Sequence, residues 1–373
     1  MINRKTVLIV LSTLIIGLIS GCTSTAGAAS SWPGITVVDD TGYFAYGASV
    51  YSIDLKNGNQ IWHYPSEPNA KTQFYAAPFA SEDMVFAGSY DNTLAALDKS
   101  NGSKKWVFSN ALDRYIASPL VVGDKVFAPN SDKYLYALNT SGDLLWKFKT
   151  SAPNWTRPVS DDKFVYLASM DHFLYAFDLE YKADSLVIDK NGSLTLLENP
   201  LWSVDLGSAV VADPVLNDGN VLVATIDGKL HNINTSTRKT NWTFVNDNQY
   251  SSVWGAPVIF DNAVFFATEK GDVYALDLKS GDPLWAEPYA TEQAIIAGGV
   301  ALEDSVLFVN NSGKLFTIDR EKVAKSIKTL DMVMYATPKK AGDTILLAPA
   351  AKEKLFMAID LVGNEIWSFI PSK

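Results

Sequence analysis

The sequence predicts an all-β fold, an eight-bladed β-propeller with four antiparallel strands in each blade, and two recurring patterns support that prediction. The first pattern reads Asp-x-x-x-Gly-x-x-x-Trp and occurs in full at Asp54/Gly58/Trp62, Asp98/Gly102/Trp106 and Asp277/Gly281/Trp285. The second is a proline or glycine at one phase of each repeat, found at Pro33, Pro78, Pro119, Pro158, Pro214, Pro257, Gly299 and Pro338. Successive markers lie about 40 residues apart, with one longer step between Pro158 and Pro214. A period of that size with several short strands per repeat is typical of a propeller.

The Asp-Gly-Trp pattern also occurs in shortened and partial forms. It is one residue shorter at Asn139/Gly142/Trp146 and Asp360/Gly363/Trp367, and it is partial at Asn234/Trp242, at Asp178/Trp202 and at Asp319, where Ile327 takes the Trp position. The glycine allows a positive φ that other residues resist. The large indole ring is suited to cover the gap between neighbouring blades. We therefore interpret seven of the ten tryptophans as structural, namely Trp62, Trp106, Trp146, Trp202, Trp242, Trp285 and Trp367.

The third repeat shows the strand pattern of one blade most clearly. Short apolar or alternating segments at residues 120–122, 125–128, 134–138 and 144–148 are separated by turn sequences such as Gly123-Asp124. The first repeat begins with an inner strand at residues 34–38, and the last ends with an outer strand at residues 366–370. We expect the ring to close by packing of blade one against blade eight, without a shared strand.

The N-terminus has the features of an exported lipoprotein. Arg4 and Lys5 precede an apolar run over residues 7–19, which is short for a membrane span and typical of a signal peptide. The run ends in Leu18-Ile19-Ser20-Gly21-Cys22, which resembles a lipobox. We expect a signal peptide at 1–21, lipidation at Cys22, a flexible tether at 22–31 and the propeller at 32–373. The alternative is an ordinary signal peptide followed by a free cysteine.

The charge limits the possible partners, and the cysteine content excludes a disulfide within the chain. The formal net charge is −10, which argues against nucleic acid as a partner and against broad adhesion to anionic lipid. Membrane attachment would then depend on lipid at Cys22, and we expect an extracytoplasmic monomer anchored to the cell membrane or the outer membrane. Cys22 is the only cysteine, so no disulfide can form within the chain.

The repeat resembles that of pyrroloquinoline-quinone-type (PQQ-like) propellers, most clearly at Tyr274-Ala-Leu-Asp-Leu-Lys-Ser-Gly-Asp-Pro-Leu-Trp285. The resemblance covers residues 32 to 373 and leaves two classes of function open. One is the small lipoprotein propellers of the BamB type, which belong to the outer-membrane β-barrel assembly machinery. This class implies a non-enzymatic scaffold that binds a protein or peptide and needs no cofactor. The other is a quinone-dependent dehydrogenase that holds a quinone and calcium at the central channel. Members of that class are usually longer, and several carry an adjacent cysteine pair that is missing here.

The candidate binding rim lies just before the markers, where the chain crosses from one blade to the next. Aromatic residues recur there at one phase, and arginines accompany them. The predicted rim consists of Tyr75, Arg114, Tyr115, Trp155, Arg157, Trp254 and Tyr335. Tyr, Trp and Arg are the residues that most often dominate binding energy at protein interfaces. The alternative is that these side chains only pack the entrance of the channel.

Other chemistry is sparse in the sequence, and we assign no catalytic or metal-binding residues. His63, His172 and His231 occupy different repeat phases, so a shared metal site is not expected. The fourth repeat contains an insertion between Asp178 and Trp202 whose residues 185–198 read as a hairpin, with strands at 186–188 and 194–197. Insertions into a regular repeat often serve binding, but a tolerated insertion without function explains the pattern equally well.

Overall fold

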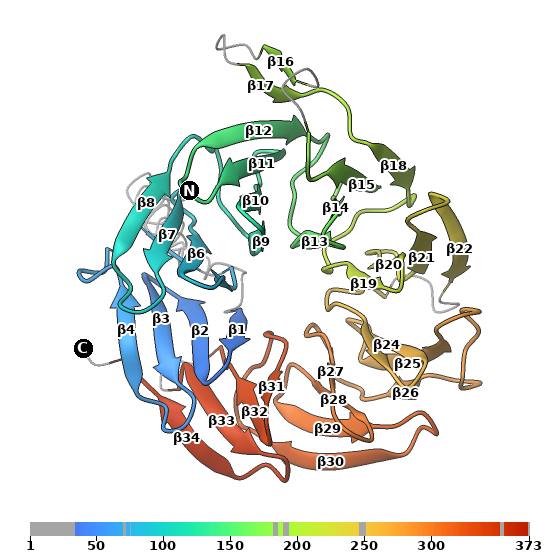
Figure 1. Ribbon diagram of the computed structural model, residues 1–373. Coiled ribbons are helices and arrows are strands. Elements are labelled where there is room, and N and C mark those ends of the chain that lie inside the picture. Colours follow the sequence, from blue (N-terminus) through green and yellow to red (C-terminus); the bar gives the residue numbers. More distant parts are fainter. Residues whose placement is uncertain are drawn as a thin grey trace, which may run out of the picture. The chain divides into compact units, whose positions relative to one another are not determined.

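Eight β-sheets form the fold in a computed structural model that describes residues 34–69, 72–74, 76–181, 186–188, 194–245, 251–350 and 354–371. All of them belong to the compact unit Trp32–Lys373. No α-helix occurs among these residues. Figure 1 shows the sheets as successive blades around a ring, with inner strands such as β1 and β13 nearest its centre.

The first four blades follow one another in chain order. Blade one contains β1 (Ile35–Val38), β2 (Thr41–Tyr46), β3 (Ser49–Asp54) and β4 (Gln60–Tyr64). Blade two contains β5 (Phe79–Ala80), β6 (Met84–Gly88), β7 (Leu94–Asp98) and β8 (Lys104–Phe108). Blade three contains β9 (Leu120–Val122), β10 (Lys125–Pro129), β11 (Tyr134–Asn139) and β12 (Leu144–Lys149). Blade four contains β13 (Val159–Ser160), β14 (Phe164–Ala168), β15 (Phe173–Asp178) and β18 (Trp202–Asp205).

The last four blades continue the same order. Blade five contains β19 (Val215–Asn217), β20 (Asn220–Ala224), β21 (Leu230–Asn234) and β22 (Lys239–Phe244). Blade six contains β23 (Val258–Phe260), β24 (Ala263–Ala267), β25 (Asp272–Asp277) and β26 (Tyr289–Ala290). Blade seven contains β27 (Val300–Ala301), β28 (Val306–Val309), β29 (Lys314–Ile318) and β30 (Ala324–Thr329). Blade eight contains β31 (Lys339–Ala341), β32 (Thr344–Leu347), β33 (Phe356–Asp360) and β34 (Glu365–Phe369).

The predicted architecture is confirmed. The strands within each blade pair in antiparallel fashion in chain order, and no strand of blade eight enters the sheet of blade one. Closure comes from packing, because β1 lies beside β31 and beside β5. In blade three the four predicted strands agree with the observed ones to within one residue at each end.

The hydrophobic core is divided into eight clusters, and each cluster fills the junction between two consecutive blades. Seven clusters contain one tryptophan of the repeat. Trp62, Trp146, Trp202 and Trp367 are buried there, whereas Trp106, Trp242 and Trp285 are half-buried. The cluster that contains Trp367 joins blade eight to blade one, so the ring closes through the same packing as every other junction.

The contact between tryptophan and glycine, which occurs across four of the junctions, explains the spacing of the repeat. An added Cβ on Gly58 would lie 2.7 Å from the ring of Trp367, and one on Gly102 would lie 2.6 Å from Trp62. The indole N–H of Trp367 donates to the carbonyl of Leu55 at 2.8 Å. Because Gly58 also has a φ of 74°, the position requires glycine for two reasons, its conformation and the close approach of the ring.

Blades five and seven depart from this arrangement. Arg238 and Lys322 take the place of the glycine with φ values of 60° and 67°. In blade seven Ile327 also replaces the tryptophan, and its side chain lies against the position of Gly363 in blade eight. The buried residues of the cluster between blades seven and eight include no aromatic ring.

We expect the junction between blades seven and eight to be the weakest, because an isoleucine buries less surface there and cannot donate the indole hydrogen bond. Native-state hydrogen exchange should show faster opening of β28 and β29 than of β24 and β25 in blade six. Ile327→Trp should slow that exchange, since its indole N–H would lie near Leu361, the residue equivalent to Leu55. Equal protection in the two blades would contradict this.

The insertion in the fourth repeat forms the predicted hairpin, but it joins the neighbouring blade. Strands β16 (Leu186–Ile188) and β17 (Leu194–Leu197) pair with each other, and β17 also pairs in parallel with β12. The sheet of blade three thereby gains two strands on its outer edge, as Figure 1 shows. Leu197 is buried in the cluster between blades three and four. The predicted turn between the two strands lies outside the described residues.

Candidate binding face

One face of the propeller is formed by the connections between blades together with the tips of the hairpins between the second and third strands. We call it the connection face, and we call the opposite side, which carries the Asp-Gly turns, the motif face. A connection lies directly on a tip: the backbone N–H of Asn154, after blade three, donates to the carbonyl of Asn130 at 3.2 Å. The sequence-predicted rim therefore lies on connections that the hairpin tips support.

Aspartates at the hairpin tips hold the connections in place. Asp132 accepts a hydrogen bond from the backbone N–H of Leu112 at 2.8 Å, and Asp171 accepts one from Ser151 at 2.8 Å. In both cases the connection leaves one blade and the carboxylate belongs to the next blade. The carboxylate of Asp171 also accepts from the hydroxyl of Tyr175 at 2.8 Å, and burial together with this bond raises the tyrosine pKa. These carboxylates thus have structural partners.

Four of the predicted rim residues lie on the connection face with accessible surface. Trp155, Trp254 and Tyr335 are half-buried, and Arg114 is exposed. The indole N–H of Trp155 donates to the hydroxyl of Ser131 at 3.2 Å, and the guanidinium of Arg114 lies 5.4 Å from the ring centre of Tyr90. We call Arg114, Trp155, Trp254 and Tyr335 the aromatic rim.

The aromatic rim is spread over several junctions. Arg114 and Trp155 come together at the tip of blade three, because the N–H of Ser131 donates to the carbonyl of Arg114 at 3.2 Å. Trp254 lies beside the tip of blade six, where its indole N–H donates to Glu269 at 3.4 Å. Tyr335 belongs to the connection between blades seven and eight.

The other three predicted rim residues differ in position. Tyr75 lies outside the described residues. Tyr115 is buried, with only 1% of its surface exposed, so it packs beneath the face and offers no contact to a partner. Gly88 makes this possible, since a Cβ there would lie 2.4 Å from that of Tyr115. Arg157 points to the centre of the ring, where its guanidinium lies 5.4 Å from the ring centre of Phe79.

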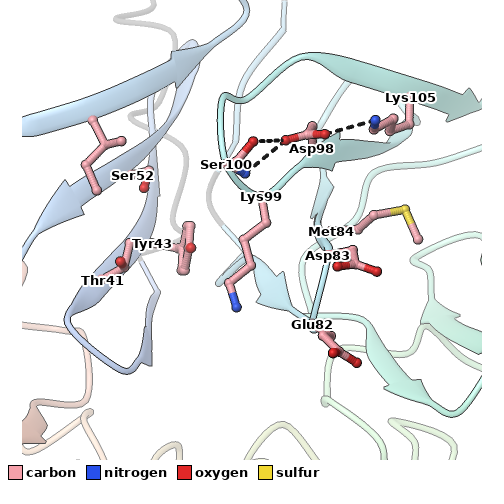
Figure 2. Close-up of a pocket in the computed structure, with 11 residues that line it drawn as sticks. Thr41, Tyr43, Ser52, Glu82, Asp83, Met84, Asp98, Lys99, Ser100 and Lys105 are labelled. Carbon is pink, nitrogen blue, oxygen red and sulfur yellow. Dashed lines mark hydrogen bonds and ion pairs between the residues drawn. The ribbon is translucent and has the colours of Figure 1, made fainter.

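A groove of about 710 Å³ lies on the motif face between blades one and two. Figure 2 shows Lys99 between Tyr43 on one side and Glu82 and Asp83 on the other. Asp98 is already committed to its own turn: it accepts from Ser100 and pairs with Lys105 at 2.9 Å. Hydrogen bonds from Ser100 and Lys105 lower the pKa of Asp98. Asp98, Ser100 and Lys105 are engaged in the turn of the repeat, so we regard the connection face as the better candidate site.

In the described part of the chain, no group of three or more His, Cys, Asp or Glu residues could hold a metal ion. Nor does that part contain a helix with the length and apolar character needed to cross a membrane.

The fold and the repeat define a PQQ-like propeller, and comparison with known proteins gives the family. The family model described as outer membrane protein assembly factor BamB matches residues 24–184 and again residues 182–369. The chain therefore belongs to the BamB family.

Individual relatives are distant. The BamB of Burkholderia pseudomallei (strain K96243) is 28% identical over 99 residues, which span 26% of this chain and 26% of that protein. The match thus covers about a quarter of the relative's length. The crystal structure of BamB from Moraxella catarrhalis superposes with a TM-score of 0.68 at 17% identity, covering 84% of this chain and 92% of that one.

A computationally designed protein, Ika8, superposes equally well. Its TM-score is 0.70 at 13% identity, with 90% of this chain and 98% of that chain covered. At such identities the likeness shows the fold alone, and function has to be argued from the surface.

Proposed function

We propose that this protein is an extracytoplasmic lipoprotein that acts as a non-enzymatic scaffold in outer-membrane protein assembly and binds a protein partner through the aromatic rim. The observation that carries the proposal is the family match over both halves of the chain. The position of the rim supports it. Arg114, Trp155 and Trp254 lie on connections that the tips support, so little conformational entropy would be lost when a partner binds.

Lipid at Cys22 is the proposed anchor, and the propeller is proposed to act as a monomer without a cofactor. A net charge of −10 supports a protein partner over nucleic acid. Partner recognition would depend on the indole and guanidinium groups of the rim, which combine large contact area with hydrogen-bonding capacity.

Cross-linking in intact cells followed by affinity purification tests the proposal. We expect the tagged protein to recover components of the β-barrel assembly machinery. Purified protein incubated with pyrroloquinoline quinone and calcium should show no shift of melting temperature and no dye reduction with sugars or alcohols. Saturable quinone binding with turnover would instead establish a dehydrogenase and overturn the scaffold proposal.

Cys22→Ser should abolish lipidation and release the protein from membranes into the soluble fraction. The reason is that a serine cannot form the thioether that carries the lipid. Fractionation of cell envelopes, with a high-salt wash, measures the distribution. A Cys22→Ser protein that stays with the membrane after that wash would contradict lipid anchoring at this residue.

A further inference from the structure

Two charged residues interrupt a layer of small side chains around the centre of the ring. The layer consists of the residues that immediately precede the repeat markers. Neighbouring members touch: the N–H of Gly298 donates to the hydroxyl of Thr337 at 2.9 Å, and the N–H of Arg157 donates to the carboxylate of Asp213 at 2.7 Å. The small members are Ala77, Ser118, Ala256, Gly298 and Thr337. Arg157 and Asp213 are the exceptions among the described members.

The side chain of Arg157 extends into the centre. Arg157 precedes blade four, yet its guanidinium lies 5.4 Å from the ring centre of Phe79 in blade two. Blade three stands between these two blades, so their residues can meet only near the axis of the ring. The Nε of Arg157 is buried and has no hydrogen-bond partner among the described residues. Nor does any carboxylate in that part of the chain lie within 4.0 Å of the guanidinium.

A second cation approaches from the opposite side. Lys339 begins β31 in blade eight, and its charge interacts with both Asp213 and Arg157. Burial lowers the pKa of Lys339, the charge of Asp213 opposes that change, and the charge of Arg157 adds to it. Burial raises the pKa of Asp213, against the N–H of Arg157 and the charges of Arg157 and Lys339. Arg157 and Asp213 are thus in direct contact, and Lys339 is close enough for its charge to interact with both.

The charges at the axis do not balance. Two cations share one carboxylate, and within the described chain neither cation forms a direct ion pair. A poorly solvated charge is costly unless it is paired and hydrogen-bonded. All three side chains keep part of their surface accessible, so a small solute can reach them. An anion placed between Arg157 and Lys339 would supply the missing partner.

We propose that Arg157 and Lys339 form an axial binding site for a single carboxylate, with Asp213 and Phe79 as its walls. A planar guanidinium matches the geometry of a carboxylate. Phe79 lies against the guanidinium, and the ligand would bind its two terminal nitrogens, because Nε itself is buried. Asp213 disfavours dianions such as phosphate, because one negative charge already stands at the site. The carboxylate belongs to a small organic acid or to the C-terminus of a peptide.

Calorimetric titration of the whole protein with sodium acetate, at constant ionic strength against chloride, tests this site. We expect saturable binding of one acetate per chain. Arg157→Gln and Lys339→Gln should each weaken it about tenfold or more, the usual effect of losing a charged hydrogen bond. Asp213→Asn should strengthen acetate binding, because it removes the competing negative charge and keeps an oxygen for the N–H of Arg157. Lys56→Gln, an exposed lysine of the motif face, is the matched control and should change nothing.

The source of the carboxylate is resolved by competition. If trialanine with a free C-terminus displaces acetate and its C-terminal amide does not, the ligand is a peptide terminus. If neither displaces it, the ligand is a small acid. Non-saturable acetate binding, equal affinity in Lys339→Gln, weaker affinity in Asp213→Asn or tighter binding of phosphate than of acetate would overturn the proposal.

Discussion

Trp367→Ala is expected to lower the free energy of unfolding by about 3–5 kcal/mol, the usual cost of removing a large buried aromatic side chain. Trp367 is 9% exposed and packs between blades eight and one, where its indole N–H holds the turn of blade one. No covalent link or shared strand reinforces this junction, so we expect the loss of Trp367 to weaken the closure of the ring. Urea denaturation gives the free energy. Ile366→Ala is the control, because Ile366 is 51% exposed and adjacent in β34, and its change should stay within about 0.5 kcal/mol.

A double-mutant cycle with Gly58 shows whether the tryptophan acts through the predicted contact. Gly58→Ala should cost more than Gly47→Ala, since both residues have positive φ but only Gly58 has a ring within 4 Å. Gly47→Ala should cost about 1–2 kcal/mol from backbone strain alone. When Trp367 is alanine, the cost of Gly58→Ala should fall to that value. If Gly58→Ala costs as much free energy without Trp367 as with it, the close approach of the ring is not the reason that this position requires glycine.

Replacing Trp155 and Trp254 together by alanine is expected to weaken partner binding by at least about 30-fold. The loss of even one hot-spot residue costs about 2 kcal/mol, which is about 30-fold in affinity. Both side chains are half-buried on the connection face, and each indole N–H reaches a hairpin tip. Quantitative affinity purification from cross-linked cells measures the effect. The melting temperature of the variant must be measured alongside, so that loss of binding is separated from loss of fold.

Val362→Ala provides the matched control for that experiment. Val362 is 70% exposed and lies in an Asp-Gly turn on the motif face. Its loss should leave recovery of the partner unchanged. If Val362→Ala reduces recovery and the double tryptophan variant does not, the partner contacts the motif face.

The repeat predicted the blades well because its signals are local. The turn at Asn139 and Gly142, the alternation over residues 134–138 and Trp146 together define a strand pair within one short segment. The pairing of β17 with β12 could not be predicted this way. It joins residues about fifty positions apart, and no local pattern encodes a parallel contact between an insertion and the previous blade.

The candidate site was only partly predictable, because residues at similar sequence phases have different surroundings. Tyr115 is buried where Gly88 leaves room for it, and that glycine at the end of β6 was an available signal. Arg157 lies one residue before the marker Pro158, whereas Trp155 lies three residues before it. The side chain of Arg157 therefore points to the axis of the ring and not to the connection face. Asp213 was not predicted as a site residue. Most residues directly before a marker are small, so a charged side chain at that position was an available signal.

Site-specific photo-cross-linking across both faces tests most directly whether the protein is a scaffold that binds through its connection face. A photoreactive phenylalanine analogue would be placed singly at Arg114, Trp254 and Tyr335, and at Lys99 and Val362 as motif-face controls. We predict cross-links to a β-barrel assembly component from the first three positions and none from the last two. Cross-links confined to Lys99 and Val362, or no protein cross-link from any of the five positions, would contradict it.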